Sequence, residues 1–153
     1  MANRPSGLNW YVLAVEPWRP NATRGDMQQH AKSILIVEDD ADVRGALTAV
    51  LEGEGYPVVE AAHGQEALQH LSADPAGFCM ILLDLWMPVM NGWEFRAQQL
   101  KDPTLAEVPV IVVTADHFAA KSATALAAVE CMTKPVEMDH LLEQIERYCR
   151  PRP

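Results

Sequence analysis

The chain has 153 residues, of which 49% are hydrophobic and 22% charged, and this composition is typical of one globular domain with a buried core. Its formal net charge is −9 at pH 7, and residues 33–153 hold nineteen acidic residues against eight basic ones. Such an acidic surface argues against binding of a nucleic-acid backbone, and no apolar run is long enough to form a transmembrane helix.

The first 32 residues do not share the pattern of the rest of the chain. Residues 9–15 are apolar enough for a strand, but Pro5, Pro17 and Pro20 interrupt their surroundings, and no signal-peptide pattern is present. We predict that residues 1–32 are a disordered N-terminal extension. A second interpretation is that translation of the natural protein starts at Met27, shortly before the first strong strand.

From residue 33 onward, the sequence alternates apolar, β-branched runs with amphipathic segments. We predict strands at residues 33–37, 58–62, 79–83, 110–113 and 131–133, and helices at about 40–54, 65–71, 91–100, 118–128 and 136–148. Parallel strands need crossover connections, and helices must then cover both faces of the sheet. The predicted fold class is therefore α/β, with a doubly wound sheet of five parallel strands. Ligands of such sheets bind beyond the carboxyl ends of the strands.

Carboxylates stand directly after two of the predicted strands. Glu38 and Asp39 end the first strand, and Asp84 follows the third. Several acids close together repel one another unless a cation offsets their charge, and Mg²⁺ prefers oxygen ligands beside a phosphate. These three side chains are therefore candidate Mg²⁺ ligands, whereas Asp40 has the position of a helix cap.

Two further polar residues follow the fourth and fifth strands. Thr114 offers a hydroxyl that can bond a phosphoryl oxygen, and its small neighbour Ala115 leaves room for that group. Lys134 precedes Pro135, which favours an extended backbone and forms a peptide bond that can be cis. An ammonium in an acidic crevice can pair with a carboxylate before phosphorylation and with the phosphoryl group after it. The crevice is thus suited to an aspartate that accepts a phosphoryl group.

The chain contains three cysteines, an odd number, and their spacing is not that of a metal site. Cys79 and Cys131 lie in or beside apolar strands, and Cys149 stands near the end of the last helix. We interpret Cys79 and Cys131 as small buried side chains, which fits a protein of a reducing cytosol.

The motifs and their order resemble the receiver domain of two-component response regulators. The matching text consists of Ile34-Leu35-Ile36-Val37-Glu38-Asp39-Asp40, Leu83-Asp84-Leu85-Trp86-Met87-Pro88 with Asn91-Gly92, Val113-Thr114-Ala115, and Thr133-Lys134-Pro135. The resemblance covers residues 33 to about 149, so we expect a receiver domain at 33–150 and a short tail at 151–153. It implies a flavodoxin-like sheet with strand order 2-1-3-4-5.

The resemblance also implies a function. Asp84 would accept a phosphoryl group from a sensor histidine kinase or a histidine phosphotransfer protein, and the domain would then signal to a downstream protein. The implied ligands of Mg²⁺ are Glu38, Asp39, Asp84 and the backbone carbonyl of Trp86, and the implied phosphoryl-binding residues are Thr114, Ala115 and Lys134. Such a protein is cytoplasmic and can form a homodimer. It is not an enzyme beyond its own phosphorylation and slow dephosphorylation.

Two features depart from the family pattern. Receivers often carry Tyr or Phe three residues before the lysine as a rotating switch, and here that position is Cys131. The stretch between Thr114 and Lys134 is also shorter than is usual, so we predict a trimmed fourth helix. Output would then run through another surface, or through Thr114 alone.

Trp86 and Asp116 stand two residues after Asp84 and Thr114, where the family's side chains flank the path of attacking water. An aspartate there can orient a water molecule, but we predict that the Trp86 indole excludes water and makes the phosphoryl group long-lived. Trp86 also stands where aspartyl-phosphate phosphatases place a second Asp, which argues against such an enzyme. The alternative function is that of a degenerate receiver, a protein-interaction module that acts without phosphorylation.

Overall fold

The computed structural model describes residues 32–121 and 123–149, and the predicted N-terminal extension and C-terminal tail lie outside this part of the chain. Its strands are β1 (Ser33–Val37), β2 (Val58–Ala61), β3 (Phe78–Leu83), β4 (Val110–Thr114) and β5 (Glu130–Thr133). Its helices are α1 (Ala41–Gly53), α2 (Gly64–Ala73), α3 (Gly92–Lys101), α4 (Pro103–Ala106), α5 (His117–Lys121), the 3-10 helix η3 (Ala123–Leu126) and α6 (Met138–Cys149). Within the described ranges, no helix is both long and apolar enough to span a membrane.

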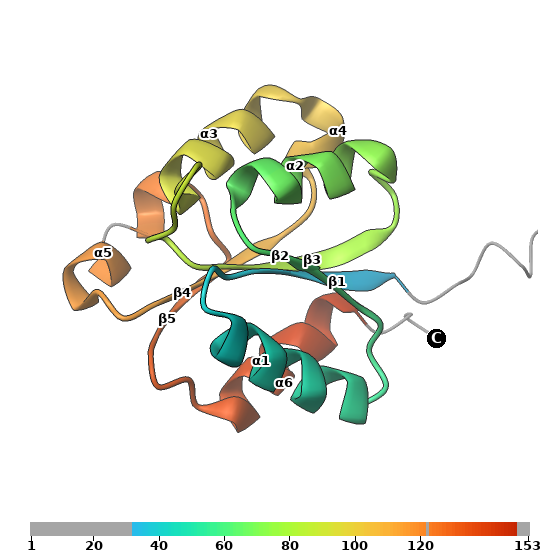
Figure 1. Cartoon of the computed structure of the whole chain (residues 1–153), viewed down its shortest axis with the longest axis vertical. Coiled ribbons are helices and arrows are strands. Elements are labelled where there is room, and N and C mark those ends of the chain that lie inside the picture. Colours follow the sequence, from blue (N-terminus) through green and yellow to red (C-terminus); the bar gives the residue numbers. More distant parts are fainter. Residues whose placement is uncertain (1–31, 122, 150–153) are drawn as a thin grey trace, which may run out of the picture. The chain divides into compact units, whose positions relative to one another are not determined.

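The five strands form one parallel sheet in the order β2-β1-β3-β4-β5, which confirms the predicted fold class and strand order. In the register, Val37 pairs with Leu83, and Thr114 pairs with Thr133. The residues that follow these pairs therefore leave the sheet along one edge, where the loops to the next helices begin (Figure 1).

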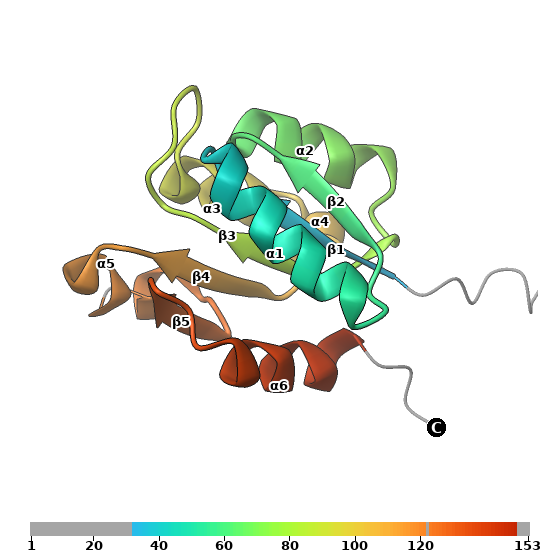
Figure 2. The same ribbon diagram turned by 60° about the horizontal axis from the view of Figure 1, so that its bottom comes forward.

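Helices cover both faces of the sheet, with α2, α3 and α4 on one face and α1 and α6 on the other (Figure 1, Figure 2). The alternation of side chains along β1 explains this arrangement, because successive residues of a strand point to opposite faces. Leu35 belongs to one core cluster with Phe95 of α3, whereas Ile34 belongs to a second cluster with Ile145 of α6. The sheet therefore has a buried apolar layer on each side.

The connection between β4 and β5 differs from the single helix predicted over residues 118–128. It forms the short α5, then η3, and then Ala127 in a left-handed conformation with a φ of 50°. Arg96 on α3 holds the end of η3, because its guanidinium donates hydrogen bonds to the carbonyl groups of Leu126 and Ala127, which have no partner within the helix. The loop before β4 also contains the one-turn helix α4, which begins at a proline with Asp102 as its cap.

The structure confirms that Cys79 is buried, and it shows a disulfide that the sequence did not lead us to expect. Cys79 on β3 and Cys149 at the end of α6 form a disulfide, with their Cα atoms 5.1 Å apart. The pairing is not evident from the sequence because the two residues are 70 positions apart and become neighbours only when α6 packs on the sheet. Cys131 on β5 keeps a free, half-buried thiol.

Candidate functional site

Three carboxylates converge where β1 and β3 end. Glu38 and Asp39 follow β1, and Asp84 follows β3, so their side chains meet at the same edge of the sheet because the two strands are direct neighbours. One carboxylate oxygen from each residue lies within 4.8 Å of the others. Glu38 and Asp84 are buried and Asp39 is exposed. The structure thus places the predicted acids in one cluster.

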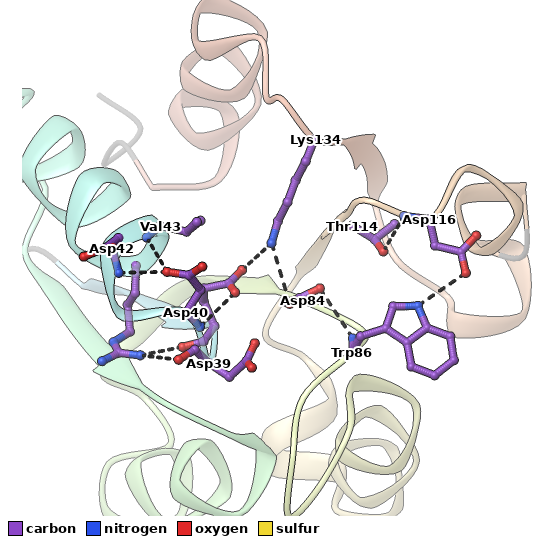
Figure 3. Close-up of polar contacts among 11 residues, drawn as sticks. Asp39, Asp40, Asp42, Val43, Asp84, Trp86, Thr114, Asp116 and Lys134 are labelled. Atoms are coloured by element: carbon purple, nitrogen blue, oxygen red, sulfur yellow. Dashed lines mark hydrogen bonds and ion pairs between the residues drawn. The ribbon is translucent and has the colours of Figure 1, made fainter.

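Asp40, the third acid of the run, has a different role. Its side chain accepts hydrogen bonds from the backbone N–H groups of Asp42 and Val43, at 2.9 and 3.2 Å (Figure 3). It is the N-cap of α1, as the sequence predicts, and it satisfies donors that the first helical turn leaves free. Arg44 of the same helix donates to the backbone carbonyl of Glu38 at 2.7 Å and so holds the turn that carries two of the acids.

Lys134 reaches the acidic cluster from the end of β5. Its Nζ lies 2.6 Å from Glu38 Oε2 and 3.6 Å from Asp84 Oδ2 (Figure 3). The Lys134–Pro135 peptide bond is cis, and the backbone N–H of Lys134 donates to the carbonyl of Thr114 at 2.8 Å. The ammonium therefore pairs more closely with Glu38 than with Asp84 and lies within reach of both.

Burial makes this cluster electrostatically costly. It raises the pKa of Asp84 and of Glu38, although Lys134 acts in the opposite direction. Burial also opposes the charge of Lys134, yet its hydrogen bond with Glu38 and the charge of Asp84 raise the pKa of the lysine. One ammonium does not neutralise three carboxylates. The remaining charge and the all-oxygen donor set fit Mg²⁺.

Asp84→Asn is expected to stabilise the metal-free domain by about 1 kcal/mol at pH 7, because it removes one of two buried like charges. A carboxyl with a raised pKa binds its proton more tightly in the folded chain than in the unfolded one, so its charge costs stability above that pKa. The gain should disappear as the pH falls toward the ordinary value of 3.8. Urea unfolding in EDTA at pH 7 and near pH 4 measures this difference. Equal stability of the two proteins at pH 7 would contradict the expectation.

Thr114 and Asp116 organise the loop that follows β4. Thr114 is buried, and its hydroxyl oxygen accepts the backbone N–H of Asp116 at 3.2 Å, with Ala115 exposed between them. The Asp116 carboxylate accepts two backbone N–H groups of α5, which lower the pKa of this side chain. Its other oxygen accepts the indole N–H of Trp86 at 3.3 Å (Figure 3). The loops after β3 and β4 are thereby tied together.

Trp86 lies at the surface of the site, with 59% of its side chain exposed. Its ring makes an edge contact with Trp93 at a centroid distance of 4.8 Å, and its backbone N–H donates to Asp84 Oδ1 at 3.4 Å. The role of its backbone carbonyl at Mg²⁺ stays a prediction. Cys131 packs against the core cluster on the α3 face, and burial raises the pKa of its thiol.

Two residues of α3 have structural roles that sequence reasoning did not assign. A Cβ on Gly92, the first residue of the helix, would lie 2.5 Å from the carbonyl oxygen of Asp84. Arg96, one turn later, is 5% exposed and bonds the carbonyl groups of η3 and its neighbour at 2.7 and 2.9 Å. The sequence feature that could have indicated this role is the position of Arg96 next to Phe95, on the buried side of the predicted helix. An arginine is rarely buried without partners, so one at this position is expected to bind acceptors inside the fold.

The comparisons with known proteins agree with this geometry. The family model described as response regulator receiver domain matches residues 34–146. The chain is 35% identical over 124 residues to the transcriptional regulatory protein CrdR of Helicobacter pylori, covering 80% of this chain and 57% of CrdR. It is 26% identical over 130 residues to the two-component response regulator ORR5 of Oryza sativa subsp. japonica, covering 84% of this chain and 96% of ORR5. The chain thus spans little more than half the length of CrdR.

Solved structures show the same fold. The response regulator protein TrrA from Thermotoga maritima, in complex with Mg²⁺ and BeF, has a TM-score of 0.68 and 28% identity, covering 76% of this chain and 98% of TrrA. A response regulator receiver protein from Pseudomonas putida has a TM-score of 0.70 and 27% identity, covering 77% of this chain and 98% of that one. The family model covers residues 34–146, and the strand order is that of the predicted receiver fold. The chain therefore belongs to the response regulator receiver domain family.

Proposed function

We propose that this domain accepts a phosphoryl group on Asp84 and signals to a partner protein through a change of conformation. The observation that supports the proposal most strongly is the convergence of Glu38, Asp39 and Asp84 with the Lys134 ammonium at one edge of the sheet. The proposed donor is the phosphohistidine of a sensor histidine kinase or of a histidine phosphotransfer protein. Receiver domains are signalling modules, so the chemistry serves a switch rather than turnover of a substrate.

In the proposed transfer, a carboxylate oxygen of Asp84 bonds to phosphorus while the bond between phosphorus and the donor nitrogen breaks. The imidazole leaves as a neutral ring that keeps the proton on its other nitrogen. Such transfers depend mainly on positioning and on neutralisation of charge at the phosphoryl oxygens. Mg²⁺ held by Glu38, Asp39, Asp84 and the carbonyl of Trp86 would supply positive charge. Lys134 supplies more, because its ammonium lies within reach of Asp84 and would move its hydrogen bond from Glu38 to a phosphoryl oxygen.

Thr114 is the residue that would form a hydrogen bond with the new phosphoryl group and move in response to it. Its hydroxyl oxygen accepts the N–H of Asp116, and this contact leaves the hydroxyl hydrogen available to a phosphoryl oxygen. A movement of Thr114 would pull on the loop that Asp116 ties to Trp86 and would displace the start of α5. We therefore propose α5 as the element through which the signal leaves the site.

Incubation with acetyl phosphate tests the proposal. The intact mass of the chain should rise by one phosphoryl group in the presence of Mg²⁺, and EDTA or the Asp84→Asn substitution should abolish the gain. Loss of phosphorylation in Asp84→Asn would not reflect unfolding, because this variant is expected to be more stable than the parent chain. No gain in mass, in protein with native circular dichroism, would overturn the proposal.

That negative result would favour the alternative, a receiver that binds its partner without phosphorylation. The specific observation behind the alternative is Cys131, because a thiol has neither the bulk nor the polar tip of the aromatic switch residue. The buried Glu38 and Asp84 and their ion pair with Lys134 support the phosphoacceptor instead, since an unused acidic cluster would only cost stability.

Trp86→Asn is expected to shorten the lifetime of the phosphoryl group by on the order of tenfold, which corresponds to ~1.4 kcal/mol of activation free energy. The backbone N–H of Trp86 donates to Asp84 and the indole N–H donates to Asp116, so we expect the ring to shield the aspartyl phosphate from attacking water. The decay of the phosphorylated mass after removal of acetyl phosphate gives the rate. Trp86→Phe keeps a ring and should retain slow decay; an unchanged rate in Trp86→Asn would refute the shielding role.

We further propose that the protein works in the cytoplasm, in contact with a histidine-bearing kinase or phosphotransfer protein upstream and an unidentified protein downstream. The acidic composition of residues 33–153 supports a protein partner rather than nucleic acid for this domain. Pull-down of the phosphorylated and unphosphorylated chain from a lysate of the source cells, compared with Asp84→Asn, would identify partners that depend on the phosphoryl group.

A further inference from the structure

The disulfide lies at the opposite edge of the sheet from Asp84. Cys79 is the second residue of β3, and Asp84 follows the last residue of the same strand, so about 16 Å of extended chain separates them. Cys149 is the last residue of α6, the helix that begins after Lys134 and Pro135. Residues 134–149 are therefore held to the rest of the domain at both ends, by the Lys134 ion pairs at the start and by the disulfide at the end.

The surroundings of the two sulfur atoms differ. Cys79 is 6% exposed within the core, whereas Cys149 is only half-buried at the end of its helix. A cavity of about 370 Å³ lies against this part of the molecule and is lined by Phe78, Cys79 and Tyr148 among others. Because Cys149 is the more exposed residue of the pair, we expect a reductant to attack its sulfur and Cys79 to be the leaving group.

We propose that Cys79 and Cys149 form a reversible, redox-responsive site that controls the end of α6. The proposal rests on the cytoplasmic location proposed above, because disulfides in a reducing compartment are usually transient and redox-sensing rather than permanent. Cys131 packs on the α3 face of the sheet and Cys149 on the opposite face, and Cys131 is also too far from Cys79 to exchange with it in the folded chain. Two strand spacings of about 4.8 Å separate β5 from β3, and this distance exceeds what a disulfide can span.

The reductant is a dithiol, either a small molecule or a protein. Its thiolate attacks the sulfur of Cys149, the bond between Cys149 and Cys79 breaks, and Cys79 leaves as a thiolate that takes a proton. The second thiol of the reductant then attacks the mixed disulfide and releases Cys149 as a thiol. The two electrons come from the dithiol, which ends as a disulfide, and the chain gains two S–H groups.

Reduction is expected to free the last turn of α6 and leave the rest of the helix in place. Leu141 and Ile145 are completely buried in the core cluster on the α1 face, so they hold the first turns without the disulfide. Tyr148 and Cys149 lie beyond these anchors and are partly exposed. The released turn would open the cavity beside Phe78 and change the surface at this end of the domain.

Counting thiols tests whether the pair is oxidised and accessible. The full chain, equilibrated with oxidised glutathione, should show one alkylated cysteine when it is unfolded in iodoacetamide, and three after prior treatment with dithiothreitol under native conditions. The Cys131→Ser variant should show no alkylated cysteine without dithiothreitol and two alkylated cysteines after treatment with it. Three alkylated cysteines without reductant would overturn the proposal, as would a disulfide that dithiothreitol reduces only in the presence of denaturant.

Hydrogen exchange and thermal unfolding then show which part of α6 reduction of the disulfide destabilises. Reduction should remove protection from amides 146–149 and preserve it at 139–144, and it should lower the unfolding midpoint by on the order of 10 °C. Cys149→Ala should reproduce both changes without reductant. Unchanged protection at 146–149, or loss of protection along all of α6, would overturn the proposed control of the helix end.

Phosphorylation by acetyl phosphate should proceed in both redox forms, because Asp84 lies at the other edge of the sheet. This measurement separates the two proposals. A chain that cannot be phosphorylated but passes the thiol and exchange tests would retain the redox site and lose the phosphoacceptor function, and the reverse result would leave only the phosphoacceptor.

Discussion

Gly92→Ala is expected to lower the free energy of unfolding by roughly 3 kcal/mol and to weaken Mg²⁺ binding at the same time. The added Cβ would lie 2.5 Å from the carbonyl oxygen of Asp84 and 2.8 Å from the Cα of Leu85. Both are backbone atoms, so no side-chain rotation relieves the contact. Relief requires movement of the start of α3 or of the loop that carries Asp84. Stability and the geometry of the carboxylate cluster should therefore be lost together.

Gly45→Ala on α1 is the matched control for this substitution. Apart from the chain neighbours and the backbone of α1 itself, no atom lies within 4 Å of a Cβ added at Gly45, and alanine is favoured over glycine inside an exposed helix. This variant should gain about 0.5 to 1 kcal/mol and bind Mg²⁺ normally. Urea unfolding measures the stability, and tryptophan fluorescence during Mg²⁺ titration measures the affinity. Equal stability of the two variants would show that the start of α3 tolerates a side chain, contrary to our expectation.

Arg96→Met is expected to cost about 3 kcal/mol of unfolding free energy, because three acceptors, two of them in buried contacts, would lose their charged donor. The guanidinium donates to the carbonyl oxygens of Leu126 and Ala127 and to the side chain of Gln99, at 2.7 to 2.9 Å. Burial lowers the pKa of Arg96, yet arginine remains charged at neutral pH, so carbonyl dipoles stabilise a buried cation here. Methionine preserves most of the apolar stem of the arginine side chain. The loss of unfolding free energy should therefore reflect the polar contacts.

Arg147→Met provides the surface control for Arg96→Met. Arg147 is 61% exposed and pairs with Glu143 one turn away at 3.3 Å, a contact expected to contribute less than about 0.5 kcal/mol. Urea unfolding compares the two variants, and hydrogen exchange should show faster opening of residues 123–129 in Arg96→Met alone. If both variants are as stable as the parent chain, Arg96 does not hold η3 in place.

The sequence was sufficient for the sheet and for the members of the acidic cluster. The apolar runs at 34–37, 80–83 and 110–113 have strand length and β-branched content, and parallel topology then brings the residues that follow them to one edge. Glu38 and Asp84 could be placed together on this argument alone. Asp40 could be separated from them, because capping is a local interaction that residue type and position reveal.

The interactions that the sequence did not reveal join residues far apart in the chain. Cys79 and Cys149 are brought together by the packing of α6, and Arg96 meets η3 thirty residues later. That contact holds the end of η3, and helix propensity, which is a local property, predicted one helix over 118–128 where the chain forms α5 and η3. No local pattern encodes such pairings, because they depend on which elements become neighbours.

The brevity of α5 has a consequence for the energetics of signalling. It has five residues, whereas isolated helices need roughly 12 to 15 to be even marginally stable in water. Its order therefore depends on the Asp116 cap and on contacts with neighbouring elements, and segments of this kind open locally at a free energy well below that of global unfolding. We therefore expect an alternative arrangement of this segment in the resting ensemble, and under the proposed function the phosphoryl group would shift the equilibrium toward it by its differential affinity for the two arrangements.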